Sequence, residues 1–124
     1  MSEQTDVTVR QATILDLDLL VRLFDAYRQF YRKPSDVDLA RRFLLERFQH
    51  NQSIVFLALQ QDGSAVGFTQ LFPSFSSVTA ARSFILNDLY VWPGGPAEGG
   101  RRLAAYCRGH FRTRGWRSPL DPLH

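Results

Sequence analysis

The chain has little of what marks several classes of protein. One cysteine, Cys107, excludes an internal disulfide framework and a cysteine-rich zinc site. The longest apolar runs fall far short of the roughly 20 residues that a membrane-spanning helix needs. Residues 1–10 are polar and lack the apolar stretch of a signal peptide. We therefore expect a soluble cytoplasmic protein with no membrane partner.

Metal-ligand spacing is also missing. We read no metal-ligand spacing between the three histidines, His50, His110 and His124, and any cysteine or carboxylate. We therefore expect no metal site. The remaining composition is that of a globular domain, because 44% of the residues are hydrophobic and ten are phenylalanine. A length of 124 residues predicts a single domain, residues 1–124.

The positive charge is confined to the end of the chain. The net charge is +3, but residues 1–92 carry nine Lys and Arg against ten Asp and Glu. Residues 93–124 carry six Arg against two acidic residues, together with six of the eight glycines and four of the six prolines. This tail is compositionally anomalous. Its arginines are interleaved with Gly and Pro rather than ordered on one face, so we expect no nucleic-acid partner.

Hydrophobic periodicity predicts an α+β fold. Apolar residues alternate in some segments, run continuously in others, and recur at helical spacing in the rest. The expected order is a strand, two helices, three antiparallel strands and a final weaker helix. Their ranges are Thr5–Thr13, Leu17–Tyr31, Ser35–His50, Ser53–Gln60, Ala65–Phe72, Ser83–Trp92 and Ala97–Phe111.

Local signals predict how these elements begin and end. Ser35 is the expected N-cap of the second helix. Asp62-Gly63 is a strong hairpin turn. Pro73 is expected to end the third strand, and the polar stretch 74–77 that follows it is expected to form a loop.

Three segments carry a resemblance to a known family. Val9–Thr13, Val66–Leu71 and Leu86–Val91 followed by Pro93 resemble the first strand, the third strand and the end of the fourth strand of the GNAT acetyltransferases. The predicted order of elements is also the order of that fold. The resemblance covers about residues 7–93 and implies a GNAT-like mixed sheet in a small stand-alone N-acetyltransferase.

The resemblance implies a co-substrate and its position. Such enzymes transfer an acetyl group from acetyl-CoA to a primary amine by direct attack, with no metal and no covalent enzyme intermediate. The fourth strand splays from the fifth, and the pantetheine arm pairs with its backbone as an added strand would. The resemblance assigns that backbone to Leu89, Tyr90 and Val91, with one N–H facing the thioester carbonyl. The alternative is that these residues form an ordinary core strand.

Asn87 and Asp88 are polar residues in an otherwise apolar strand. Burial of polar groups is unfavourable unless they are paired or useful. Asp88 is the candidate base that takes the ammonium proton of the substrate, directly or through water, with Asn87 beside it. An equally simple interpretation is a strand-end carboxylate satisfied by backbone.

The acceptor amine is expected at the end of the first helix. In the family this helix and the loop after it wall the acceptor site, and here they carry Tyr27, Phe30, Tyr31 and Arg32. Aromatic rings hold an alkylammonium by cation–π contact. Core and rim packing is the alternative role. The acceptor stays open between a small amine, a polyamine, an aminoglycoside and a protein lysine.

The resemblance breaks in the tail. The family's pyrophosphate loop has a basic residue before its glycines, whereas here Gly99 and Gly100 precede Arg101 and Arg102, and Glu98 stands among them. These four Gly and Arg residues are the candidate pyrophosphate ligands. The C-terminal strands of the family are expected to be missing or altered. No residue inherits the family's general-acid tyrosine.

One hypothesis covers these departures. A one-base shift near the Val91 codon permits a translation that resembles the family's pyrophosphate loop, helix and fifth strand. The chain would then be impaired, and the outer edge of the fourth strand would be left unpaired. That edge would accept another chain by exchange or pair edge to edge in a homodimer. The main rival function is a non-catalytic binding or dimerisation domain. A nucleic-acid module using the arginine-rich tail is the less favoured rival.

Overall fold

The computed structural model describes residues 6–78, 80–110 and 116–117. Its helices are α1 (Leu17–Phe30), α2 (Val37–Gln49) and α3 (Glu98–His110), with a short 3-10 helix η2 (Ile14–Asp16) before α1. Its strands are β1 (Val7–Gln11), β2 (Ile54–Gln60), β3 (Ala65–Ser76), β4 (Ala81–Val91) and β5 (Trp116–Arg117). The predicted α+β fold and its order of elements are confirmed. The predicted bounds at Thr5 and Phe111 lie outside the described residues.

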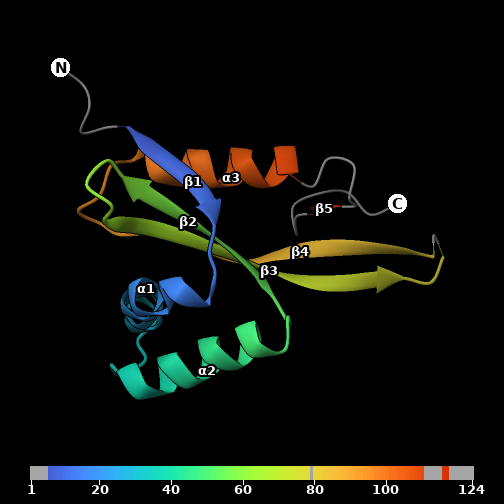
Figure 1. The fold of residues 1–124 in the computed structure, drawn as a ribbon, viewed down its shortest axis with the longest axis horizontal. Helices are drawn as coiled ribbons and strands as arrows, with labels where there is room; N and C mark the ends of the chain where they lie inside the picture. The colour runs from blue at the N-terminus through green and yellow to red at the C-terminus, as the bar shows by residue number, and fades with distance from the viewer. Residues whose placement is uncertain (1–5, 79, 111–115, 118–124) are drawn as a thin grey trace.

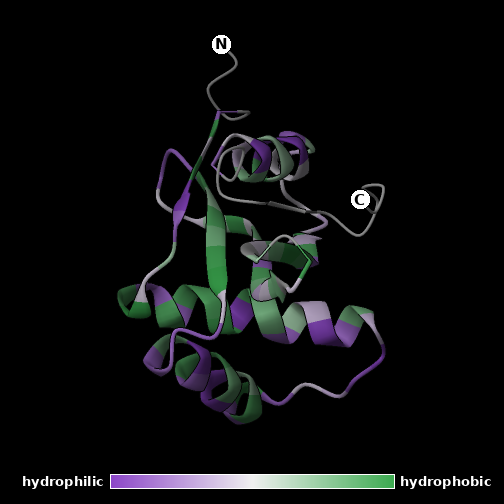
Figure 2. Cartoon of the chain, turned by 90° about the vertical axis from the view of Figure 1, so that its right-hand side faces the viewer, coloured by the Kyte–Doolittle hydropathy of each residue, from purple (hydrophilic) through white to green (hydrophobic). Residues whose placement is uncertain are grey.

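The strands form one sheet between two helical layers. The order is β1-β2-β3-β4-β5, and the first four strands are antiparallel while β5 runs parallel to β4. Helices α1 and α2 lie together on one side of the sheet, and α3 lies on the other (Figure 1). The strands at the centre are hydrophobic, and the helices carry hydrophilic and hydrophobic residues in turn (Figure 2).

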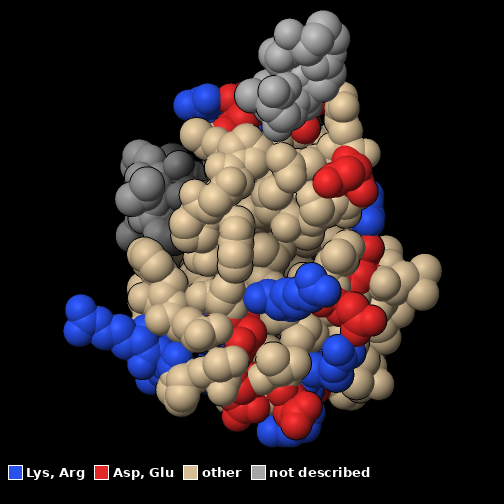
Figure 3. All heavy atoms as spheres, turned by 90° about the vertical axis from the view of Figure 1, so that its left-hand side faces the viewer, with Lys and Arg blue, Asp and Glu red and all other residues tan. Residues whose placement is uncertain are grey.

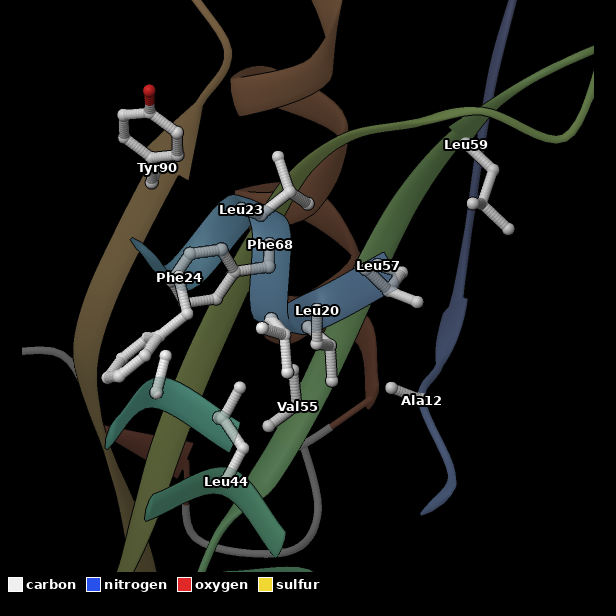
Figure 4. Packing of buried hydrophobic residues seen from close by; sticks show 12 residues of the cluster. Ala12, Leu20, Leu23, Phe24, Leu44, Val55, Leu57, Leu59, Phe68 and Tyr90 are labelled. Atoms are coloured by element: carbon white, nitrogen blue, oxygen red, sulfur yellow. The ribbon is translucent and has the colours of Figure 1, made fainter. Parts of the chain in front are cut away.

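Each face of the sheet has its own hydrophobic core. On one face, Leu20 and Phe24 of α1 pack with Leu57 of β2 and Phe68 of β3 (Figure 4). On the other, Leu103 of α3 packs with a second cluster, which includes Val7, Phe56, Leu71 and Cys107. Full burial of one such side chain contributes about 1.5–3 kcal/mol relative to leaving it exposed.

A capping box starts the helical layer. Thr13 caps η2, and the side chain of Asp16 accepts a hydrogen bond from the Thr13 backbone N–H. Asp16 also forms two hydrogen bonds with the Arg10 guanidinium, both of 2.8 Å. The Arg10 bonds outweigh burial and hold the pKa of Asp16 below its ordinary value. These contacts fix the turn between β1 and α1.

The prediction that Ser35 caps α2 is wrong. The cap is Asp36, whose side chain accepts from the Leu39 N–H at 3.0 Å. Ser35 instead donates to the buried Asp25 carboxylate of α1 at 2.6 Å, and the Asp36 N–H donates to the same group at 2.8 Å. The Asp25 carboxylate therefore links the start of α2 to α1. The Ser35 hydroxyl, which the sequence pattern assigned to the N-cap of α2, is used in this link instead.

The predicted loop at 74–77 is a continuation of the hairpin. Strand β3 runs past Pro73 to residue 76 and pairs with β4 up to Ala81. Strand β2 ends its pairing with β3 at Leu71, so Pro73 lies where β3 has a neighbour on one side only. A proline is tolerated in a strand at such an edge position because its missing N–H is not required there.

The outer edge of β4 is partly covered. Strand β5 has two residues, and Trp116 and Arg117 pair with Phe84 and Ile85 of β4. The expectation that no fifth strand would form and that this edge would be fully unpaired is therefore wrong over Phe84–Ile85. In the described part of the chain no strand pairs with the same edge at residues 86–91. The C-terminal part of the sheet is therefore altered as expected: in the described residues it consists of a two-residue strand paired with part of β4.

Candidate active site

A β-bulge in β4 creates the candidate site. Leu86 pairs with Leu71, whereas Asp88 pairs with Gln70, so Asn87 is one extra residue in β4. An extra residue shifts the alternation of side chains by one position. Leu86 accordingly packs with the core on the α3 side, and Asp88 turns toward α1.

Four side chains converge on this turn of the strand. Asp88 is only 8% exposed, and its Oδ1 accepts a hydrogen bond of 2.7 Å from the Tyr27 hydroxyl of α1. Its Oδ2 accepts bonds of 3.0 Å from Gln70 of β3 and from the neighbouring Asn87. The carboxylate is therefore satisfied by side chains rather than by the backbone groups that the sequence suggested.

An aromatic cluster surrounds the Tyr27–Asp88 bond. The Tyr27 ring lies 5.2 Å from that of Tyr31 and 5.8 Å from that of Tyr90, centroid to centroid. Phe30 extends the cluster, 5.3 Å from Tyr31. Phe30 and Tyr31 are 68% and 60% exposed, while Tyr90 is buried. The cluster thus has a buried side at Asp88 and an open side toward solvent, so Tyr27, Phe30 and Tyr31 do come together as predicted.

The phenols of the partly buried Tyr27 and the buried Tyr90 are held in the neutral form. Burial, followed by the hydrogen bond to Asp88, raises the pKa of Tyr27 well above its ordinary value. Burial also raises the pKa of Tyr90. At neutral pH Tyr27 is therefore a hydrogen-bond donor and not a base.

Arg32 follows the cluster at the end of α1. Its backbone adopts φ 66°, the left-handed region, as the chain leaves the helix. In the described part of the chain no carboxylate pairs with Arg32 or with Lys33. The open side of the aromatic cluster therefore has a cationic neighbour.

Beyond the bulge, no strand among the described residues pairs with the outer edge of β4, which is the free edge of this strand. The Trp92 N–H donates to the Val66 carbonyl of β3 at 2.7 Å. Residues of an antiparallel ladder alternate between facing the partner and facing away. The N–H groups of Leu89 and Val91 therefore face away from β3, while the N–H group of Tyr90 faces it. Of the three predicted backbone residues, two present the groups that an added strand would need.

The first turn of α3 holds the four predicted pyrophosphate ligands. Arg101 and Arg102 both form ion pairs with Glu98, and Arg102 also donates to the Val7 carbonyl at 3.1 Å. A Cβ added at Gly100 would lie 3.3 Å from Val91. This turn is therefore packed closely against the end of β4, and its arginines are engaged with a carboxylate of their own helix.

A separate hollow of about 600 Å³ lies beside α1. It is lined by Arg22 and Ala26 of α1, by the β2–β3 turn, and by the turn 92–95 after β4. None of the predicted site residues lines it. Figure 3 shows the face that carries the β2–β3 turn, where charged side chains gather in the lower part, over α1 and α2. The middle of that face is largely uncharged.

Sequence reasoning missed Gln70 and Ser53. Gln70 is 1% exposed and accepts a hydrogen bond of 2.8 Å from the Ser53 hydroxyl. A signal was present, since Thr69 and Gln70 are consecutive polar residues inside an apolar strand. Thr69 donates at 2.6 Å to the backbone carbonyl of Asp88, on the other side of the sheet from Gln70.

Two features are absent from residues 6–78, 80–110 and 116–117, a helix that could span a membrane and a cluster of metal-binding side chains. No helix there has the length and apolar character to cross a membrane. No group of three or more His, Cys, Asp or Glu side chains lies close enough together to hold a metal ion.

Comparison with known proteins places this geometry in a family. The chain is 43% identical, over 101 residues, to the uncharacterized N-acetyltransferase YhfO of Bacillus subtilis, a match that covers 80% of this chain and 67% of that protein. It is 36% identical over 76 residues to a probable acetyltransferase of Haemophilus influenzae, covering 61% of this chain and 52% of that one. The chain thus spans about two thirds and about half of these relatives.

A solved structure agrees with the curated relatives. The crystal structure of a probable acetyltransferase is 34% identical, with a TM-score of 0.84, and the match covers 92% of this chain and 79% of that one. No family model matches the chain. The sequence identity, the coverage and the order of helices and strands agree with one another. The chain therefore belongs to the GNAT superfamily of N-acetyltransferases, a family of acyltransferase enzymes.

Proposed function

We propose that this chain transfers the acetyl group of acetyl-CoA to a primary amine by direct attack, without a metal or a covalent enzyme intermediate. The observation that supports this most strongly is the Asp88 carboxylate. It lies at the bulge of β4, between the aromatic cluster and the free edge of the strand. An acceptor amine and a thioester that occupied those two places would meet beside it.

The free edge of β4 suits the pantetheine arm. Its amides would pair with the outward N–H and C=O groups of Leu89 and Val91 as an added strand does. One of these N–H groups would donate to the thioester carbonyl and stabilise the oxyanion that forms on attack. Tyr90, the third predicted residue, would keep this backbone in place through its buried ring.

The aromatic cluster suits the acceptor amine. The rings of Tyr27, Phe30 and Tyr31 would hold its alkylammonium form, a contact of about 0.5–2 kcal/mol. Asp88 would then take the ammonium proton, directly or through water, with Asn87 fixing one carboxylate oxygen. The amine nitrogen forms a bond to the acetyl carbon, the carbon–sulfur bond breaks, and the leaving thiolate takes a proton from solvent.

The acceptor is a small-molecule or protein amine. Arg32, next to the cluster, would contact an acidic group of the acceptor if it has one. The same position disfavours a polycation, because like charges repel within a Debye length of about 8 Å at physiological salt. We propose that the reaction takes place in the cytoplasm.

The pyrophosphate is assigned to the first turn of α3. The positive end of the helix and the Arg101 and Arg102 guanidinium groups would contact it. Both arginines would first have to leave Glu98. We therefore expect weaker binding of acetyl-CoA than a cradle without a carboxylate would give, which is the form that impairment of this chain would take.

Calorimetric titration of the chain with acetyl-CoA tests the first half of the proposal. Glu98→Gln is the informative variant, because it frees both arginines, and it should bind acetyl-CoA several-fold more tightly than the unaltered chain. Release of the CoA thiol with a panel of mono-, di- and polyamines tests the second half. A folded chain that binds no acetyl-CoA at high concentration would instead support a non-catalytic domain.

A further inference from the structure

The Asp88 carboxylate is held from both the helix and the sheet. Oδ2 accepts two hydrogen bonds, from Gln70 and Asn87, and Oδ1 accepts one, from Tyr27. A carboxylate offers about four lone-pair sites, two on each oxygen. The site that is left is on Oδ1, beside the Tyr27 hydroxyl and the aromatic cluster.

Gln70 decides which oxygen is left. It stands directly across from Asp88 in the β3–β4 register, and its Nε2 reaches Oδ2 at 3.0 Å. At 1% exposure the amide is out of contact with water. A buried amide needs an acceptor for its N–H groups, and Nε2 finds one in the carboxylate, so Gln70 holds Oδ2 inside the sheet.

Ser53 fixes the orientation of the Gln70 amide. The Ser53 hydroxyl donates to Oε1 of Gln70 at 2.8 Å. If the amide were turned over, its oxygen would face the carboxylate oxygen and both would be acceptors. The carboxylate, which only accepts, therefore keeps the N–H group pointing at Asp88, and the Ser53 hydroxyl holds the Oε1 end of the amide in place.

We propose that Gln70 is a positioning residue for acetyl transfer, which orients Asp88 so that Oδ1 faces the acceptor amine, with Ser53 fixing the orientation of Gln70. This inference rests on the proposed function. It adds Gln70 of β3 and Ser53, which immediately precedes β2, to a site that otherwise consists of residues of α1 and β4. Neither of them touches the amine or the thioester.

The test is a comparison of kcat and KM in matched variants. Gln70→Met keeps an unbranched side chain of similar length and removes the donor. Hydrogen bonds to charged groups contribute roughly 1.5–3 kcal/mol, so kcat should fall by roughly ten- to a hundredfold. KM for acetyl-CoA should stay within twofold, because Gln70 lies away from the free edge of β4. Ser53→Ala should show a smaller loss of kcat in the same direction.

Thr69→Val is the matched control. Thr69 is the neighbour of Gln70, is fully buried, and donates to the backbone carbonyl of Asp88 instead of to its carboxylate. Its loss should lower the melting temperature about as much as Gln70→Met does and leave kcat within about threefold. A residue that acts only through stability would give the same kcat in both variants.

The outcomes separate the two proposals. If the unaltered chain is active and Gln70→Met has the same kcat as Thr69→Val, the positioning role is wrong and the proposed function stands. If the unaltered chain acetylates no amine, both fall. Should Gln70→Met fail to fold, Gln70→Glu keeps the shape and puts a carboxylate against Oδ2. Full activity of that variant would equally overturn the positioning role.

Discussion

Gly67 is the position where one added methyl group tests the site most directly. It lies in β3 beside the part of β4 that we assign to acetyl-CoA. A Cβ placed on Gly67 would meet the Tyr90 carbonyl oxygen at 2.8 Å and the Leu103 Cδ1 at 3.3 Å. It would also lie 3.4 Å from the Val91 Cα. Two of these three atoms belong to backbone, so the strand itself would have to move.

The expected cost of Gly67→Ala follows from these distances. Overpacking of this kind costs roughly 1–3 kcal/mol. Alanine restricts the unfolded chain more than glycine does, and this offsets roughly 0.5–1 kcal/mol of the lost stability. The net destabilisation is then about 0.5–2 kcal/mol, which lowers the melting temperature by roughly 2–10 °C for a domain of this size.

The same shift should weaken acetyl-CoA binding. Movement of β4 at Tyr90 changes the direction of the outward N–H groups on either side of it. One misplaced hydrogen bond is equivalent to roughly 0.5–1.5 kcal/mol, or about a two- to tenfold weaker affinity. Thermal unfolding measures the first effect, and calorimetric titration with acetyl-CoA measures the second.

Gly109→Ala is the matched control. A Cβ at Gly109, near the end of α3, has nothing within 4 Å. Alanine is favoured over glycine in a helix by about 1 kcal/mol, so this variant should be slightly more stable and bind acetyl-CoA as before. Unchanged melting temperature and affinity in Gly67→Ala would refute the close approach of β3 to β4 on which the site depends.

Three further predictions concern the carboxylates of Asp88 and Asp16 and the thiol of Cys107. Asp88→Asn removes the proposed base and keeps its size, so kcat should fall by roughly 10²- to 10⁴-fold while acetyl-CoA affinity, measured by calorimetry, stays within twofold. The Arg10 hydrogen bonds lower the pKa of Asp16, so this carboxylate stabilises the fold above the unfolded pKa of about 3.9 and loses that effect as the pH falls through the lower folded pKa. Urea unfolding at a series of acidic pH values should show this loss in the unaltered chain and much less of it in Arg10→Gln. Burial raises the pKa of the Cys107 thiol to about 12, so a thiol reagent should label it only after unfolding, and rapid labelling of the folded chain would contradict its buried position.

The sequence predicted the elements but not their exact pairing. Helical spacing from Leu17 onward and the Asp62-Gly63 turn are local signals, and both correspond to the structure. The bulge at Asn87 is not local, because it depends on which residue of β3 faces Leu86. In β4, apolar residues occur at both odd and even positions. The alternation of apolar and polar residues therefore does not predict which residue of β3 each residue of β4 faces.

The residues of the candidate site were likewise visible in the sequence, but the contacts between them were not. The aromatic run at the end of α1 and the polar residues in β4 were visible as departures from a simple amphipathic pattern. Their meeting through the Tyr27–Asp88 hydrogen bond joins residues that are 61 positions apart. The role of Gln70 is further removed, since it depends on the register across the hairpin and on a hydroxyl 17 positions earlier. A short sequence motif cannot reveal either contact, because the partners of each lie far apart in the sequence.

The tail is where composition was most misleading about structure. Its glycines suggested a phosphate loop, and helix propensity alone made a helix there weak. In the structure Gly99 is buried, and a Cβ added there would make an ordinary contact of 3.6 Å with Val91 of β4, whereas one added at Gly100 would come within a tight 3.3 Å of the same side chain. Further along α3, Leu103 and Cys107 are fully buried in the core of that face. The helix is therefore held by packing against the sheet, and its glycines let it approach. This packing role and the proposed contact with pyrophosphate are compatible only if the phosphate meets the arginines. We therefore expect the ion pairs with Glu98 to set how tightly this chain binds acetyl-CoA.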